Sequence, residues 1–387
     1  MAHRRGLSEF RSRLVSVGGC FAIVIASIAA DASADVFNMP GQTSLSLVPV
    51  GNPGNPNDVV WSQGFRFGGV SYAYNIGRFE VTVAQYAEFL NAVAVTDTYS
   101  LYDPNMASNL NSGGIARTGP SGSYSYDVFG APNHPVTFVS WGDAARFANW
   151  LSNGQPMGLQ DTNTTEDGSY TMNGAIFNPE LQMVLRNTDA RFVVPSENEW
   201  YKAAYYDPTP GAGGNNYWLY PMRTDSVPYS DQPPGLDAPI PAITGNFKKD
   251  DGLVNGYDDG FAVTGSTVYL STQNYLTDVG AYIASMSYYE TFDQGGNITE
   301  WTDTRTSSIS RNIRGGDWFN NESQMRASNR TGAAAEAGSS NLGFRIAEIP
   351  VPEPSSISLI GFGLFLASAV RRRFYPSGFA RISSSRR

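Results

Sequence analysis

Cysteine is nearly absent from this 387-residue chain, because its single cysteine, Cys20, lies close to the N-terminus. Histidine is almost as scarce, with His3 at the N-terminus and His134 farther along the chain. The main part of the chain therefore cannot form a disulfide or supply a thiolate as nucleophile or metal ligand. With one histidine, it cannot build a multi-histidine zinc site either.

Long hydrophobic runs are absent except at the two ends. At the N-terminus, four arginines precede an apolar run over residues 14–30, and the small-residue sequence Ala32-Ser33-Ala34 follows. Basic, apolar and small residues in this order predict a secretory signal peptide over residues 1–34, with a helical apolar part. The alternative is an N-terminal membrane anchor, but the small-residue sequence favours cleavage after Ala34.

The C-terminal end also combines three signals. Pro352-Glu353-Pro354 precedes an apolar run over residues 357–370, and three arginines at 371–373 close it. The run is shorter than the ~20 residues of a comfortable membrane helix, but the arginines are typical of a cytoplasmic stop signal. Residues 351–387 resemble the PEP-CTERM sorting signal of Gram-negative bacteria, although the chain continues farther past the arginines than is usual there. The resemblance implies a short membrane helix, processing by an exosortase, and delivery to the outer surface or extracellular matrix.

The body between these ends, residues 35–350, is poor in positive charge. Ten of the 26 lysines and arginines and three of the 35 acidic residues lie in the two ends, which leaves 16 basic and 32 acidic residues and a net charge of −16. Such a surface excludes nucleic acid as a partner, since phosphate binding needs basic residues. It suits an extracellular protein that meets divalent cations.

Local patterns predict a mixed fold for the body. Three segments, at about 82–94, 140–152 and 196–205, begin with a serine or threonine and continue with an apolar face at helical spacing, so we expect short helices there. Alternating apolar and polar residues over 61–79 predict strands. With 40 glycines and 23 prolines, the remainder is expected to form long irregular loops. The expected class is an irregular, loop-rich α+β domain.

Five motifs follow one another along the body. They are IGRFEVT at 76–82, PVTFVSWGDA at 135–144, RFVVPSENEW at 191–200, GNITEW at 296–301, and RGGDW at 314–318 completed by GFR at 343–345. Together they resemble the formylglycine-generating, or sulfatase-modifying factor, family. The resemblance implies a C-type-lectin-like fold over residues 35–350, with little regular structure, long loops and one core.

The chemistry of that family depends on two cysteines that hold a copper ion. The resemblance places them at Asn320 and Met325, and Asp317 replaces the serine of the preceding motif. Neither side chain supplies the thiolate that Cu(I) prefers, and the body contains no cysteine that could substitute. We therefore expect no copper, no catalytic residues of the family type and no formylglycine-generating activity.

Calcium is a different matter, because the resemblance implies two structural sites built from oxygen atoms. The first set is Asn246, Phe247, Asp259 and Phe261, and the second is Asp293, Gly296, Ile298 and Glu300. Calcium takes six to eight oxygen ligands, and both sets offer oxygen alone. The alternative is that the acids cap turns in a solvated loop, since Asp-Gly turns are common without metal.

The other motif residues are predicted to be structural. The motif tryptophans are expected in the core: Trp141, Trp200, Trp301 and Trp318. Arg314 and Arg345 are expected to pair with buried carboxylates, for which Glu199 and Glu300 are the candidates.

Two functions remain open from the sequence. The favoured one is a non-oxidase binding module for glycan or protein, with an exopolysaccharide or a surface protein as partner and membrane contact through the C-terminal segment alone. The alternative is an enzyme of another reaction type that uses carboxylates such as Asp303, Asp317 and Glu322 in the ancestral groove. Fold resemblance by itself does not decide between them.

Overall fold

The computed structural model describes residues 43–209 and 215–350. The predicted signal peptide, residues 1–34, and the predicted sorting segment, residues 351–387, lie outside the described residues, and so do the helices expected there. Among the described residues, none of the helices combines the length and the apolar character that a membrane crossing requires.

The three predicted helices are confirmed. They are α1 (Val83–Val93), α3 (Trp141–Ser152) and α5 (Glu197–Tyr205). Each begins after a hydroxyl side chain, of Thr82, Ser140 or Ser196, that accepts the N–H of the third helical residue. The side chain of that third residue in turn accepts the N–H of the cap. This capping box pairs N–H groups that a helix start otherwise leaves unsatisfied, so the start of each helix is fixed locally.

Short strands form two four-stranded sheets. The first has the order β1 (Leu47–Val50), β2 (Tyr74–Gly77), β14 (Ala347–Glu348), β5 (Phe192–Val193). The second has the order β12 (Thr331–Ala333), β11 (Arg311–Arg314), β10 (Thr299–Arg305), β13 (Leu342–Gly343). In the first sheet β2 pairs with β14, so the beginning and the end of the described chain close on each other. Residues 35–350 are therefore expected to fold without the two ends.

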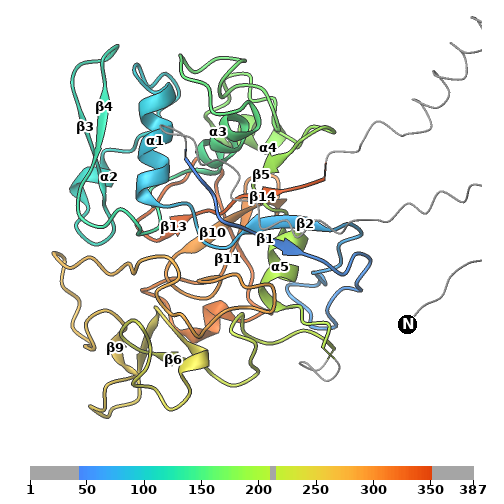
Figure 1. The fold of residues 1–387 in the computed structure, drawn as a ribbon, viewed down its shortest axis with the longest axis vertical. Helices are drawn as coiled ribbons and strands as arrows, with labels where there is room; N and C mark the ends of the chain where they lie inside the picture. Colours follow the sequence, from blue (N-terminus) through green and yellow to red (C-terminus); the bar gives the residue numbers. More distant parts are fainter. Residues whose placement is uncertain (1–42, 210–214, 351–387) are drawn as a thin grey trace, which may run out of the picture. The chain divides into compact units, whose positions relative to one another are not determined.

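The remaining elements are small and lie between long loops (Figure 1). The two-stranded pairs are β3 (Ile115–Thr118) with β4 (Ser125–Val128), β6 (Tyr229–Ser230) with β7 (Thr244–Gly245), and β8 (Lys248–Asp250) with β9 (Asp259–Phe261). The short helices are α2 (Asn105–Ser108), α4 (Asn178–Met183), η1 (Pro241–Ile243) and η2 (Glu322–Met325). This mixed, loop-rich arrangement agrees with the expected α+β class.

The prediction of strands across residues 61–79 is largely wrong, because β2 is the main strand there. Residues 62–65 form a tight turn closed by a bridge between Ser62 and Phe65. Ahead of β2, the side chain of Asn55 accepts the N–H of Val70 and donates to a neighbouring carbonyl. Asparagine side chains compete for backbone groups that a strand partner would otherwise use.

Aromatic side chains join the helices to the closing motif. On α1, the ring of Phe89 lies 5.3 Å from the ring of Phe147 on α3, and Phe147 lies 5.4 Å from Phe344. Both pairs are edge-to-face, an arrangement that contributes about 0.5–1.5 kcal/mol beyond burial. The predicted core positions of the motif tryptophans are also confirmed, since none of the four is more than 4% exposed.

The two motif arginines are paired, but one partner differs from the prediction. Arg345 holds Glu300 through two contacts of 2.6 and 2.7 Å, as expected. Arg314 binds Glu197 instead of Glu199, at 2.9 and 2.6 Å. Glu199 is used by the capping box of α5 and by Arg186. Residues two apart on a helix do not share a face, so the two glutamates meet different arginines.

Candidate functional site

A polar pocket of about 360 Å³ lies at the second sheet, and all four strands of that sheet contribute to its wall. Its polar side chains include Thr299, Asp317, Asn320, Gln324, Asn329 and Asn341. Thr299 begins β10, and Asp317 and Asn320 belong to the loop between β11 and η2. The pocket thus contains one of the two positions at which the resemblance places the family's cysteines.

A glycine turn brings this loop into place. Gly315 and Gly316 follow β11 with φ angles of 104° and 69°, the left-handed region that favours glycine. A Cβ atom on Gly316 would lie 2.9 Å from the Cβ of Gln324. The turn therefore depends on glycine for its backbone angles and also for the close approach of η2.

Asp317 organises the polar side chains of the pocket. Its Oδ1 accepts the side-chain amide of Asn320 at 2.6 Å and the N–H of Phe319 at 2.9 Å. Its Oδ2 accepts the amide of Asn341 at 2.7 Å and the hydroxyl of Thr299 at 3.1 Å. Burial raises the pKa of Asp317, while these donors act in the opposite direction. The carboxylate holds two amides and one hydroxyl in fixed orientations around the cavity.

The two positions of the family's cysteines lie in different surroundings. Asn320 lines the pocket. Met325 is fully buried in an apolar cluster that also contains Tyr220 and Phe247. One position therefore presents an amide to the pocket and the other fills the core with a thioether.

The carboxylates of the alternative enzyme hypothesis are not gathered at the pocket. Asp303 is paired with Arg186 at 3.3 Å and with Arg311 at 3.0 Å. Asp317 belongs to the pocket wall, whereas Glu322 and Asp303 are not part of it. A pair of carboxylates in one cleft, which general acid–base chemistry would use, is not found in this wall.

Exposed aromatic side chains stand beside the pocket loop. Phe319, between two pocket residues in the chain, is 52% exposed, and Tyr269 is 47% exposed. Their rings are 6.3 Å apart and perpendicular. The sequence analysis did not single out either residue; the position of Phe319 next to the RGGDW motif was the signal available.

The first predicted calcium set is engaged by protein donors. The carbonyl oxygen of Phe247 accepts the hydroxyl of Ser230 at 2.6 Å. The carboxylate of Asp259 accepts two N–H groups of its own turn. The carbonyl of Phe261 accepts N–H groups of the following turn, and the amide of Asn246 donates to the carbonyl of Tyr275. Each of the four residues therefore makes at least one hydrogen bond within the protein through the group named here.

The second set lies in a buried group with surplus negative charge. Glu300 is held by Arg345, and Asp293 accepts the N–H of Gly280 at 2.6 Å. Glu80, which the sequence analysis did not identify, is 2% exposed, and its Oε2 lacks a hydrogen-bond partner. Burial raises the pKa of Glu80 and of Asp293.

Three carboxylates, of Glu80, Asp293 and Glu300, thus face one arginine in the second set. An unpartnered buried carboxylate oxygen is costly unless a cation or a proton reaches it. Within the described ranges, no three His, Cys, Asp or Glu side chains are arranged to hold one metal ion. An ion here would need further oxygens beside these carboxylates, and the resemblance implies the main-chain oxygens of Gly296 and Ile298.

Two family models match the chain, one over the body and one at its C-terminal end. Residues 69–349 match the sulfatase-modifying factor enzyme 1-like domain, so the chain belongs to this family. Residues 350–373 match the PEP-CTERM protein-sorting motif. This motif indicates export to the cell envelope of a Gram-negative bacterium and processing by an exosortase-type system.

Solved structures of similar fold share little sequence with the chain. CarF is 18% identical, with a TM-score of 0.46 over 79% of this chain and 98% of its own. PvdO from Pseudomonas aeruginosa is 18% identical, with a TM-score of 0.42 over 81% and 96%. Treponema denticola variable protein 1 is 17% identical, with a TM-score of 0.40 over 80% and 97%. Comparison with curated proteins gives no match. Likeness at this level carries no inference about ligand or activity.

Proposed function

We propose that the chain is a non-oxidase, glycan-binding module of the bacterial outer surface or extracellular matrix. The observation that carries this proposal is the polar pocket around Asp317, which stands at a position of the family's cysteines but presents amides and hydroxyls. A glycan at this site would join the chain to an exopolysaccharide or to a glycosylated surface protein.

The chemistry of the pocket suits a sugar. Amide and hydroxyl side chains both donate and accept hydrogen bonds, as sugar hydroxyls require. Asp317 fixes the amides of Asn320 and Asn341, so little side-chain entropy is lost on binding. Phe319 does not line the pocket, but it lies between Asp317 and Asn320 in the chain and its ring is exposed, so it could add the apolar contact that small-molecule sites combine with polar groups. The net charge of −16 on residues 35–350 favours a neutral or basic glycan over an acidic one.

Calcium belongs to the proposal as a structural ion at the second set. Glu80 and Asp293 supply two carboxylates beyond the one that Arg345 neutralises, and Glu80 adds the unpartnered oxygen. A divalent cation there would offset the buried negative charge and stabilise the loop that carries the GNITEW motif. No catalytic step is assigned to it.

A glycan microarray probed with residues 35–350 tests the proposed function. Phe319→Ala removes the exposed ring, and Asn320→Ala removes one pocket amide. Leu253→Ala is the matched control, because Leu253 is also exposed, at 60%, and does not line the pocket. We expect selective binding that both variants of the loop after β11 weaken and the control, which lies outside this loop, leaves unchanged. Binding that is absent, or that is equally strong in all variants, would contradict the proposal.

A further inference from the structure

The polar pocket at the second sheet contains amide groups that the described part of the protein does not use. Gln324 and Asn329 line the pocket, and both are half-buried. Within residues 43–209 and 215–350, neither side-chain amide makes a hydrogen bond. Each amide has two N–H donors and one acceptor oxygen. Half-buried amides without a partner are positions for the polar groups of a ligand.

The main chain holds these two amides at the pocket. The Cβ of Gln324 lies so close to the glycine turn that a Cβ added to Gly316 would approach it to 2.9 Å. The carbonyl oxygen of Asn329 accepts Nη1 of Arg314 at 2.6 Å. Both residues thus stand on anchored backbone, and their side chains can orient toward a ligand at little cost.

A third amide, that of Asn320, has its orientation set by a neighbour. Its Nδ2 donates to the carboxylate of Asp317 at 2.6 Å. Because an ionised carboxylate accepts hydrogen bonds and cannot donate them, the nitrogen faces Asp317 and the oxygen faces away. No donor among the described residues meets this Oδ1. The pocket therefore combines a fixed acceptor at Asn320 with donors at Gln324 and Asn329.

Part of the pocket wall is apolar. It is formed by Ile313 on β11, Ala333 on β12, and the later residues Ala337 and Leu342. The volume of about 360 Å³ is near the lower end of the ~300–1,000 Å³ of small-molecule pockets. A single sugar ring occupies most of such a space, so the apolar wall suits a substituent as small as a methyl group.

The charged groups of the wall are already bonded within the protein. Arg314 binds Glu197, and Asp317 accepts hydrogen bonds at both of its oxygens. A charged ligand would have to displace one of these partners or remain uncompensated. A neutral ligand therefore matches the pocket better than an ammonium or a carboxylate.

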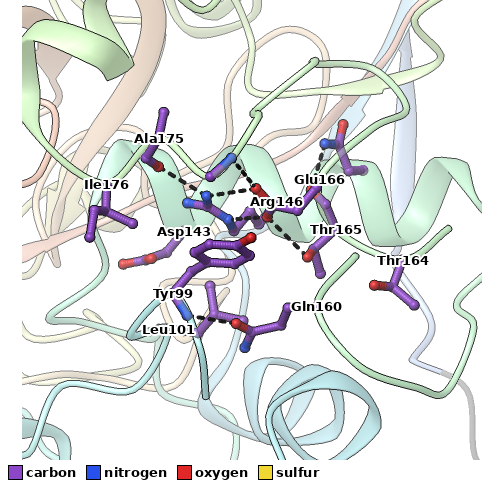
Figure 2. Close-up of polar contacts among 12 residues, drawn as sticks. Tyr99, Leu101, Asp143, Arg146, Gln160, Thr164, Thr165, Glu166, Ala175 and Ile176 are labelled. Atoms are coloured by element: carbon purple, nitrogen blue, oxygen red, sulfur yellow. Dashed lines mark hydrogen bonds and ion pairs between the residues drawn. The ribbon is translucent and has the colours of Figure 1, made fainter. Parts of the chain in front are cut away.

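The cavity of about 200 Å³ at the start of α3 shows the contrast. There Arg146 binds both oxygens of Glu166, at 2.6 and 3.0 Å, and the carbonyl of Ala175 at 2.9 Å (Figure 2). The carboxylate of Asp143 accepts the N–H of Ser140. Charged groups with partners inside the protein line that cavity, whereas neutral amides without partners line the pocket beside Asp317.

We infer that the polar pocket recognises an N-acetylated amino sugar, an inference that rests on the proposed glycan-binding function. The N–H of the acetamido group donates to Oδ1 of Asn320, and its carbonyl oxygen accepts from the amides of Gln324 and Asn329. Its methyl group lies against the apolar wall at Ala333 and Ala337. One substituent thereby uses the free acceptor, the free donors and the apolar surface together.

Isothermal titration calorimetry on residues 35–350 tests the inference with four sugars: N-acetylglucosamine, N-acetylgalactosamine, glucose and glucosamine. We expect at least one acetamido sugar to bind at least about tenfold more tightly than both glucose, which has a hydroxyl at that position, and glucosamine, which has an ammonium. Equal affinity for all four, or tightest binding of glucose or glucosamine, would overturn the inference.

Variants locate the acetamido group. Gln324→Ala and Asn329→Ala should each weaken binding of the acetamido sugar several-fold and leave the affinity for glucose unchanged. Asn163→Ala is the matched control, because Asn163 is an exposed asparagine that does not line the pocket. It should change neither affinity. Unchanged binding of the acetamido sugar in both pocket variants would place this sugar elsewhere and overturn the inference.

The glycan microarray separates failure of this inference from failure of the proposed function. Array binding to neutral glycans without preference for acetamido sugars would overturn the inference and leave the glycan-binding function standing. The same holds if none of the four sugars binds while the array is positive. An array without any binding would contradict the proposed function, and the inference with it.

Discussion

Removal of the buried arginine Arg345 is predicted to destabilise the domain strongly. Arg345 is fully buried and binds Glu300 through two short contacts. It also donates to the carbonyls of Gly77 and Phe292, at 2.9 Å each, and so joins β2, the loop before the GNITEW motif and the GFR motif. Arg345→Met leaves the carboxylate of Glu300 uncompensated beside two further acids. The expected loss in the free energy of unfolding is about 3–5 kcal/mol.

Urea unfolding of residues 35–350, followed by fluorescence, measures this loss. The double variant Arg345→Met/Glu300→Gln removes the unpaired charge and should recover part of it. Arg191→Met is the matched control, because Arg191 pairs with Glu348 but is 49% exposed, and such pairs contribute about 0–1 kcal/mol. A loss below about 1 kcal/mol in Arg345→Met, or a double variant less stable than the single one, would refute the reasoning.

Three further predictions follow from the sites. Burial raises the pKa of Asp143 to about 7 in the folded chain, against an ordinary value near 4. Because the folded state binds this proton more tightly than the unfolded state, the contribution of Asp143 to stability falls as pH rises from about 4 to 7. Wild type should therefore lose more free energy of unfolding between pH 5 and pH 8 than Asp143→Asn does. The charged residues around Asp143, which are Arg146, Asp97, Asp103 and Glu336, are present in both proteins, so their own titration is common to the two. Equal losses in wild type and variant, measured by unfolding at the two pH values, would contradict this. Calcium at a hundred times its dissociation constant should raise the free energy of unfolding by ~2.7 kcal/mol. Glu80→Gln should reduce this gain, and Asp259→Asn should leave it unchanged. The same melting midpoint in calcium and in chelator would show that calcium does not bind. Incubated with copper and a C-x-P-x-R peptide, residues 35–350 should produce no formylglycine, since Asn320 and Met325 provide no thiolate; its detection by mass spectrometry would overturn the non-oxidase claim.

Local signals in the sequence were enough for the helices. Thr82, Ser140 and Ser196 fix the starts of α1, α3 and α5 through bonds to residues three positions away, so sequence spacing contains the information. The Arg345–Glu300 pair was also predictable, because both residues belong to recognised motifs.

Contacts between distant segments were not accessible in the same way. The partner of Arg314 is Glu197, 117 positions away in the chain, and the choice between Glu197 and Glu199 depends on which face of α5 meets β11. The Asp317 amide network depends on the glycine turn that brings Asp317 within reach of Asn341. Likewise, the unpartnered oxygen of Glu80 is a property of its buried surroundings, which a motif does not record.

The most direct test of the central claim asks where a glycan binds. Hydrogen exchange of residues 35–350 would be measured with and without the oligosaccharide that binds most strongly on the array. The account predicts slower exchange in the pocket segments, residues 315–325 and 339–343, because a ligand held by Asn320 and Asn341 would restrain the loop after β11. Protection confined to other segments, or no protection at saturating oligosaccharide, would contradict the claim that this pocket binds glycan.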